Sequence, residues 1–297
     1  MHQPVLLKQL LDFFKERKIT SFIDGTLGAG GHARALLEAH PEIEKFYGID
    51  QDPEALEIAS KILTPFSNKI EIYPSNFRHM GSLFAGKKVE GILLDLGVSS
   101  MQLDRPEKGF SFSKGGPLDM RMDPSQPLDA ATVVNQFSAA KLGEIFRELG
   151  EERRWKSAAA AIVEGRRKKR IQTTEDLANI LKPVLTWGGR TKGKKIHPFT
   201  LVFQALRIYV NDELKVIQEV IPQALSLLNP GGRLVIISFH SLEDRLVKVT
   251  FKEYAKEKRG VLLTKKPLEA DEEEIKENPR SRSAKMRCIE SCSQETY

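Results

Sequence analysis

The chain has 297 residues, of which 40% are hydrophobic and 29% charged, and its formal net charge is +6. This length suffices for one large domain or two smaller ones, and the absence of any run of eighteen apolar residues excludes a transmembrane helix. The two cysteines, Cys288 and Cys292, are too few for a disulfide framework or a zinc site, and no secretory signal is recognisable. We therefore expect a cytoplasmic protein that has no membrane association.

The first third of the chain alternates apolar runs with helix-like segments, a pattern typical of a doubly wound parallel sheet. Amphipathic spacing predicts helices over residues 5–14, 33–39 and 53–63. Four strands are predicted, and they end at Asp24, Asp50, Tyr73 and Asp95. The apolar residues of the fourth strand are continuous, which is typical of a parallel strand covered on both faces.

A glycine-rich turn after the first predicted strand is the most informative motif. It follows Asp24, contains glycines at 25, 28, 30 and 31, and precedes a second strand that ends at Asp50. Glycines allow a tight turn and a close approach to a ligand, and a carboxylate at Asp50 can accept hydrogen bonds from ribose hydroxyls. Ala33 stands where a dinucleotide fingerprint needs glycine, and the acidic residue before the turn suits a cationic ligand. The pattern favours S-adenosylmethionine over NAD, and a turn that binds nothing is the remaining alternative.

Two further strand ends carry candidate residues. Phe77 follows the third strand, where its ring can cover an adenine or belong to the core, and both interpretations stay open. Asp95 ends the fourth strand, at the place where open α/β sheets bind ligands, and its alternative role is to form a turn. Gln102 lies just beyond and can contact the same ligand. No two histidines have metal-ligand spacing, so no metal is expected.

After Asp95 the alternation of strands and helices stops. Residues 105–127 are rich in Gly, Pro, Ser and Asp, and only helix-like segments follow, at 139–149, 153–163, 173–185 and 199–210. A strand at 232–238, a helix that starts at Ser241 with capping-box spacing, a polar loop over 265–279 and a last strand over 283–290 complete the chain. We therefore predict a nucleotide-binding domain formed by residues 1–104 and 213–297, and an all-helical insertion over residues 105–212.

The excess positive charge lies within this insertion. Residues 153–195 contain thirteen Lys and Arg against three acidic residues, so the rest of the chain is net negative. Such asymmetry predicts a polyanion-binding surface, although a solvated helix surface would show the same pattern. The candidate phosphate-binding residues form two basic stretches: Arg166, Arg167, Lys168, Lys169 and Arg170, and then Arg190, Lys192, Lys194 and Lys195.

Together these motifs resemble the bacterial ribosomal RNA small subunit methyltransferase H family over nearly the whole chain. The segments that carry the resemblance are residues 23–32, 91–100, 109–112, 116–123, 203–208, 237–245 and 277–283. The resemblance implies an α/β fold with a Rossmann-like class I methyltransferase sheet and an inserted helical RNA-recognition domain. It also implies that the methyl donor contacts Gly30, Gly31, His32, Asp50, Phe77, Asp95 and Gln102.

The resemblance further implies methylation of cytidine N4 in the decoding region of 16S rRNA, either free or within the small ribosomal subunit. The N4 lone pair is delocalised into the ring, so Asp95 is expected to act as the catalytic residue by accepting a hydrogen bond from N4. The base has to leave its stack to reach the site. Monomer and homodimer both stay open. Two other functions also stay open: an RNA-binding ribosome assembly factor with a relic donor pocket, and an NAD-dependent oxidoreductase.

Overall fold

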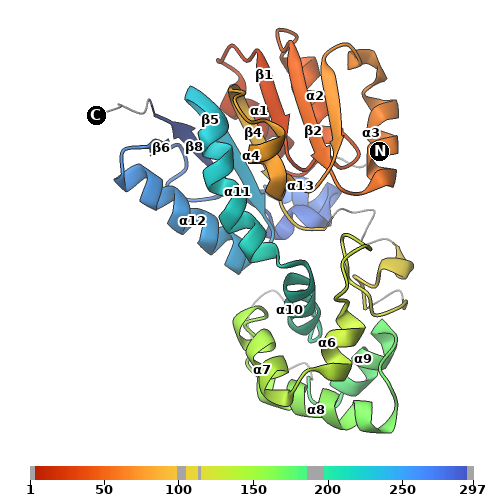
Figure 1. Cartoon of the computed structure of the whole chain (residues 1–297). Helices are drawn as coiled ribbons and strands as arrows, with labels where there is room; N and C mark the ends of the chain where they lie inside the picture. Colours follow the sequence, from red (N-terminus) through yellow and green to blue (C-terminus); the bar gives the residue numbers. More distant parts are fainter. Residues whose placement is uncertain (1–3, 99–104, 113–114, 186–196, 293–297) are drawn as a thin grey trace. The chain divides into compact units, whose positions relative to one another are not determined.

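The computed structural model describes residues 4–98, 105–112, 115–185 and 197–292, and the chain divides into two compact units (Figure 1). The first unit joins Met1–Gly97 to Leu214–Tyr297, and the second is Val98–Glu213. The sequence pattern places the two divisions at 104/105 and 212/213. None of the helices in the described part of the chain has the length and apolar character needed to span a bilayer.

The first unit is built on one sheet with strand order β3-β2-β1-β4-β5-β8-β6, and β7 pairs with β8. The first five strands pair in parallel, whereas β8 runs antiparallel to its neighbours. This architecture confirms the predicted α/β class. The strands are β1 (Ser21–Asp24), β2 (Lys45–Asp50), β3 (Ile70–Pro74), β4 (Val89–Asp95), β5 (Leu228–Ser238), β6 (Gly260–Leu262), β7 (Leu268–Glu269) and β8 (Lys285–Ser291).

Helices cover both faces of this sheet, which explains why its central strands are apolar without alternation. On one face Ile23 and Ile92 pack with residues of α4, α11 and α12, and on the other Phe22 and Leu93 pack with α1, α2 and α3. The helices of this unit are α1 (Leu7–Phe14), α2 (Gly31–Ala39), α3 (Pro53–Ile62), α4 (Met80–Leu83), α11 (Glu213–Leu227), α12 (Ser241–Lys256) and α13 (Glu272–Glu277). Three short 3₁₀ turns are η1 (Thr64–Phe66), η2 (Phe77–His79) and η4 (Pro279–Ser283).

The second unit has a hydrophobic core of its own, in which Leu142, Phe146 and Ile162 are fully buried. Its helices are α6 (Ala130–Gln136), α7 (Ala139–Glu148), α8 (Trp155–Lys168), α9 (Thr174–Leu181) and α10 (Thr200–Asn211), with the 3₁₀ turn η3 (Pro106–Lys108). Thr173 and Asp176 form a capping box at the start of α9. A separate core of this kind is what a compact inserted body requires.

The structure contains helices that the sequence pattern does not predict, among them α4, α6 and α11. The pattern predicts neither α6, which is only seven residues long, nor α11, in which Pro222 lies inside the helix. Proline is a helix breaker in local sequence terms, and packing of α11 against the sheet overrides that preference.

Two local predictions are wrong. The stretch 265–279 is not only a polar loop, because it contains β7 and α13, and Glu274 of α13 accepts a hydrogen bond from Leu6 N, 268 residues away. The capping box of α12 is formed by His240 and Glu243, one residue earlier than the spacing from Ser241 predicts.

Candidate functional site

Three acidic side chains lie at one end of the sheet. Strands β1, β2 and β4 end in Asp24, Asp50 and Asp95. These strands are parallel and β1 lies between the other two, so the three residues share the end of the sheet that we call the carboxyl edge. From β1 the chain adds β2 and β3 on one side, and it then adds β4 and β5 on the other side. Open α/β sheets bind ligands at the point where the order of strands switches sides, which here lies between β1 and β4.

The glycine-rich turn leaves this edge in a conformation that depends on glycine. Gly28 and Gly30 have φ values of +52° and +82°, in the left-handed region where a side chain is strained. The turn is tied to both neighbouring strands, because Gly25 N donates to Leu93 O and Leu27 N donates to Ile49 O, each at 2.9 Å. It therefore leads directly into the N-terminus of α2, where exposed backbone N–H groups can meet a ligand.

Asp50 is oriented by the backbone on both sides. Its Oδ2 accepts from Gly28 N at 2.8 Å and its Oδ1 accepts from Asp52 N at 2.9 Å. Burial raises the pKa of Asp50, and these hydrogen bonds counteract the rise. Each carboxylate oxygen can accept a further hydrogen bond. Asp50 is not the N-cap of the following helix, because Asp52 caps α3 by accepting a hydrogen bond from Glu54 N.

Asp24 is almost completely buried, with 1% of its surface exposed. Its Oδ1 accepts from the backbone N of Thr26 at 3.0 Å and from the hydroxyl of Thr26 at 3.3 Å. Its Oδ2 is buried and has no hydrogen-bond partner among the residues that the structure describes. Burial raises the pKa of Asp24 to about 7, against the effect of the Thr26 hydrogen bond, and the charge of Asp50 adds to the rise.

Asp95 lies beside Asp24 and is linked to it through Thr26. The backbone N of Asp95 donates to Thr26 Oγ1 at 2.7 Å, and the same hydroxyl donates to Asp24. Asp95 Oδ1 is buried and, within the described parts of the chain, accepts no hydrogen bond. Burial raises the pKa of Asp95 well above its ordinary value, and the charges of Asp24 and Glu243 raise it further.

His32 faces Asp95 from the first turn of α2. Its Nε2 lies 2.9 Å from Val5 O and must donate, since a carbonyl oxygen only accepts. In the neutral ring Nδ1 then carries no proton, and it lies 3.8 Å from Asp95 Oδ2, too far for a hydrogen bond. Burial lowers the pKa of His32 to about 4. At neutral pH His32 therefore brings no positive charge to the carboxyl edge.

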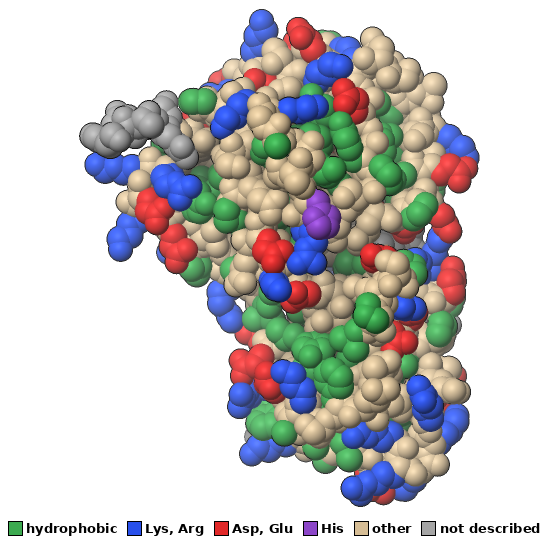
Figure 2. Space-filling model, in the orientation of Figure 1, with side chains coloured by type: hydrophobic (Ala, Val, Ile, Leu, Met, Phe, Trp, Pro, Cys, Tyr) green, Lys and Arg blue, Asp and Glu red, His purple; other side chains and the backbone are tan. Residues whose placement is uncertain are grey.

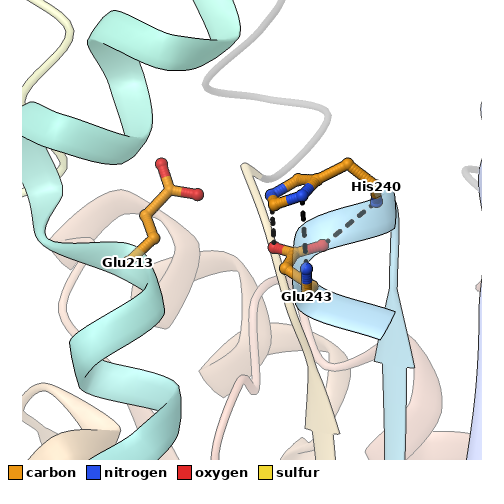
Figure 3. A group of neighbouring side chains, drawn as sticks. All are labelled: Glu213, His240 and Glu243. Carbon is orange, nitrogen blue, oxygen red and sulfur yellow. Dashed lines mark hydrogen bonds and ion pairs between the residues drawn. The ribbon is translucent and has the colours of Figure 1, made fainter. Parts of the chain in front are cut away.

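Glu243 is a buried acid to which the sequence pattern assigns no role. Figure 3 shows it beside His240 at the start of α12, directly after β5. Its Oε2 accepts from Phe239 N at 2.8 Å and from His240 N at 3.2 Å, and His240 Nε2 lies 3.2 Å from its other oxygen. The sequence signal for this arrangement is the spacing of three residues between His240 and Glu243. The charge of Glu243 raises the pKa of Asp95.

Phe77 begins η2, three residues after the end of β3. Its ring is half-buried and packs against the core on the α11 face of the sheet. A Cβ built at Gly25 would lie 3.4 Å from the Cβ of Phe77, so the residue also borders the glycine-rich turn. The core and ligand interpretations of Phe77 are thus compatible. Gln102 lies outside the described residues.

The first basic stretch of the second unit lies at the C-terminal end of α8, and Figure 2 shows Lys and Arg side chains gathered over this part of the unit. Arg167, Lys168, Lys169 and Arg170 are exposed. Arg167 and Lys168 form ion pairs with Glu164 that are solvent-exposed and therefore weak, and Lys169 pairs with the partly exposed Asp176. These side chains can exchange such partners for phosphates.

Arg166 differs from the rest of this stretch. Its Nη1 donates to Val134 O at 2.8 Å and to Phe137 O at 2.7 Å. These carbonyls belong to the C-terminal end of α6, so Arg166 holds two helices of the second unit together. The residues of the second basic stretch, Arg190, Lys192, Lys194 and Lys195, lie outside the described part of the chain.

The sequence is similar to known proteins along nearly its whole length. The profile of the MraW methylase family matches residues 1–292. The ribosomal RNA small subunit methyltransferase H of Protochlamydia amoebophila is 50% identical, with 97% of this chain and 96% of that protein covered. The protein of the same name from Heliobacterium modesticaldum is 42% identical, with 97% and 98% covered.

Among solved structures, an rRNA methylase from Streptococcus thermophilus has a TM-score of 0.45 and 12% identity, and the match covers 99% of each chain. The N-methyltransferase NodS from Bradyrhizobium japonicum, in complex with S-adenosyl-L-homocysteine, has a TM-score of 0.45 and 9% identity, with 97% of this chain and 86% of that chain covered.

The burial of Asp24 predicts an unusual pH dependence of stability. A carboxyl group whose pKa is raised by folding stabilises the protein below its unfolded pKa, and this contribution is lost as the pH rises from about 4 to about 7. The Asp24→Asn variant stays neutral throughout. Its free energy of unfolding relative to the native chain should therefore rise by about 4 kcal/mol between pH 4 and pH 8, at 1.36 kcal/mol per pKa unit.

Urea unfolding at both pH values measures this difference. The exposed Asp12→Asn variant on α1 serves as the control and should follow the native chain at both. Parallel pH profiles for Asp24→Asn and the native chain would contradict the raised pKa of Asp24.

Proposed function

Because the chain belongs to the MraW methylase family, we propose that it transfers a methyl group from S-adenosylmethionine to N4 of a cytidine in 16S rRNA. The observation that carries the proposal is the convergence of Asp24, Asp50 and Asp95 around a glycine turn at the carboxyl edge. The name of the relatives supports ribosomal RNA of the small subunit as the substrate.

The charge of the carboxyl edge supports this donor. S-adenosylmethionine is cationic at its sulfur and at its amino group, and three acidic side chains attract such a ligand. A dinucleotide would bring a pyrophosphate to the same place, where Asp24, Asp50 and Asp95 would repel it, so NAD is disfavoured. Asp50, already oriented by Gly28 and Asp52, would accept hydrogen bonds from the ribose hydroxyls.

Methyl transfer requires the protein to align the reacting atoms more than to activate the methyl group. When bound, the donor supplies a methyl group that is already activated by its positive sulfur. The protein has to hold the attacking nitrogen in line with the methyl carbon and the sulfur. Asp95 ends β4 beside the glycine-rich turn, where its carboxylate would accept a hydrogen bond from N4 and raise the electron density on that nitrogen. The cytosine would have to leave its stack to reach Asp95.

The second unit would bind the rRNA. The exposed Lys and Arg side chains at the end of α8 offer phosphate contacts. The compact core of the second unit gives these side chains a rigid support. An assembly factor without activity would need the same basic surface, but it would not need the buried oxygen of Asp24, which has no hydrogen-bond partner among the described residues. Such a costly group is expected at a site that is in use.

Replacement of Asp95 tests the reaction. We expect Asp95→Asn to lower the single-turnover rate on the order of a hundredfold while donor affinity changes much less, because the transition state would no longer be stabilised by one positioned polar group. The assay uses radiolabelled donor and small-subunit rRNA, followed by nucleoside analysis, with Asp12→Asn as a variant of equal charge change. Label on carbon 5 or on a ribose oxygen would contradict the N4 assignment, and an unchanged rate would remove Asp95 from catalysis.

Replacement of Asp50 tests donor binding. We expect Asp50→Ala to weaken binding of S-adenosylmethionine by about 1.5–3 kcal/mol, the value of a hydrogen bond to a charged group. Calorimetric titration measures this change, and RNA binding by the same variant should stay as in the native chain. If the variant binds the donor with native affinity, Asp50 does not contact the ribose.

Removal of charge from α8 tests RNA binding. The variant replaces Arg167, Lys168, Lys169 and Arg170 by Gln and keeps Arg166, because that side chain holds α6. We expect weaker binding to rRNA and a salt dependence whose slope falls by about 0.7–0.9 for each phosphate that the variant no longer neutralises.

The matched control replaces four exposed lysines of the first unit by Gln, namely Lys248, Lys252, Lys256 and Lys276. It removes the same charge and should keep most of the native salt slope. Equal slopes for the α8 variant and the native chain would show that the α8 cations are only solvated.

A further inference from the structure

Asp24 and Asp95 form a pair of carboxyl groups for which the protein supplies too few hydrogen-bond donors. Thr26 connects them, because its hydroxyl donates to Asp24 and accepts from the backbone of Asp95. One oxygen of each side chain, Asp24 Oδ2 and Asp95 Oδ1, is buried without a hydrogen bond from the described residues. Burying an unpaired carboxylate is so costly that such a group is stable only with a proton or a cation.

The groups of the described residues that face this pair add negative charge and supply no positive charge. Asp50 on β2 adds negative charge near Asp24, and Glu243 on α12 adds negative charge near Asp95. His32 on α2 faces Asp95 but is neutral, because its buried ring is held by Val5 O through Nε2. Two neighbouring carboxylates in such surroundings do not both ionise near neutral pH.

The proposed function supplies the missing cation, and the inference rests on it. We propose that the pair of Asp24 and Asp95 is protonated when no methyl donor is bound, that donor binding expels one proton from the pair, and that the carboxylate thus formed on Asp95 accepts the proton that cytosine N4 loses during methylation. The pair would thereby act as a proton acceptor that only the bound donor makes available.

The charges balance over the whole cycle. A proton leaves the pair for solvent when the positively charged donor enters. In the transfer step a bond forms between N4 and the methyl carbon, the bond between that carbon and sulfur breaks, and its electron pair stays on sulfur. The proton of N4 passes to Asp95. The sulfur is then neutral and the pair has regained the proton that it lost, so the attraction between the pair and the bound molecule is weaker and product release is favoured.

Calorimetric titration of the full chain with S-adenosylmethionine tests this proposal. Titrations in buffers of different ionisation enthalpy measure the number of protons released on binding. Between pH 5.5 and 7 we expect close to one proton, and an affinity that rises toward tenfold per pH unit. With S-adenosylhomocysteine, which lacks the positive sulfur, we expect less than half a proton.

Two variants identify the source of the proton. Asp24→Asn removes one carboxylate of the pair, so we expect it to release less than half a proton on donor binding and to show a flattened dependence of affinity on pH. Asp50→Asn makes the same change on the neighbouring strand. It should bind the donor more weakly but still release close to one proton.

The outcomes separate this inference from the proposed function. Failure of the native chain to bind the donor at every pH would overturn both. Binding and methylation without proton release would overturn the inference alone. Proton release that is unchanged in Asp24→Asn, or equal for donor and product, would also overturn it, because the proton would then come from another group or respond to another charge.

Discussion

Parallel pairing of β1 with β2 on one side and β4 on the other is the constraint from which the candidate site follows. The register places Asp24 opposite Gly48 of β2 and Leu93 of β4, so Asp50 and Asp95 each lie two residues beyond Asp24 along their own strands, at the same edge of the sheet. Adjacent strands lie about 4.8 Å apart, so the charges of the acids at this edge interact with one another. Three acids that are distant in sequence are thereby forced into one small region, and their mutual repulsion becomes a property of the fold.

This repulsion lowers the stability of the folded protein. A neutral side chain at position 24 would fold more easily at neutral pH, because Asp24 has to be buried next to other acids. Retention of a destabilising group at the carboxyl edge is what a trade-off between stability and activity would produce there. The donor-coupled proton that we propose is one way in which such a destabilised pair can be useful.

The glycine-rich turn is held from outside by two segments that no local pattern connects with it. Val5 O fixes the ring of His32, and Pro4 packs so closely against Gly31 that a Cβ there would lie 2.8 Å from the Pro4 ring. Leu6, which follows Val5, donates its backbone N–H to Glu274 of α13. The amino-terminal segment and α13 together thus hold the turn and His32 in position, and the polar stretch that contains α13 has a structural role.

The sequence by itself determined the α/β class, the positions of the parallel strands, the turn and its acids, and the charge of the insertion, because each depends on local periodicity or residue type. Only the tertiary structure decided which of these side chains are buried, hydrogen-bonded or exposed. It showed that Arg166 is bound to α6 while its basic neighbours stay exposed, that Pro222 is accommodated inside α11, and that Glu243 adds its charge to the carboxyl edge. Burial and long-range contacts set hydrogen bonding and pKa, and neither can be read from the spacing of residues along a chain.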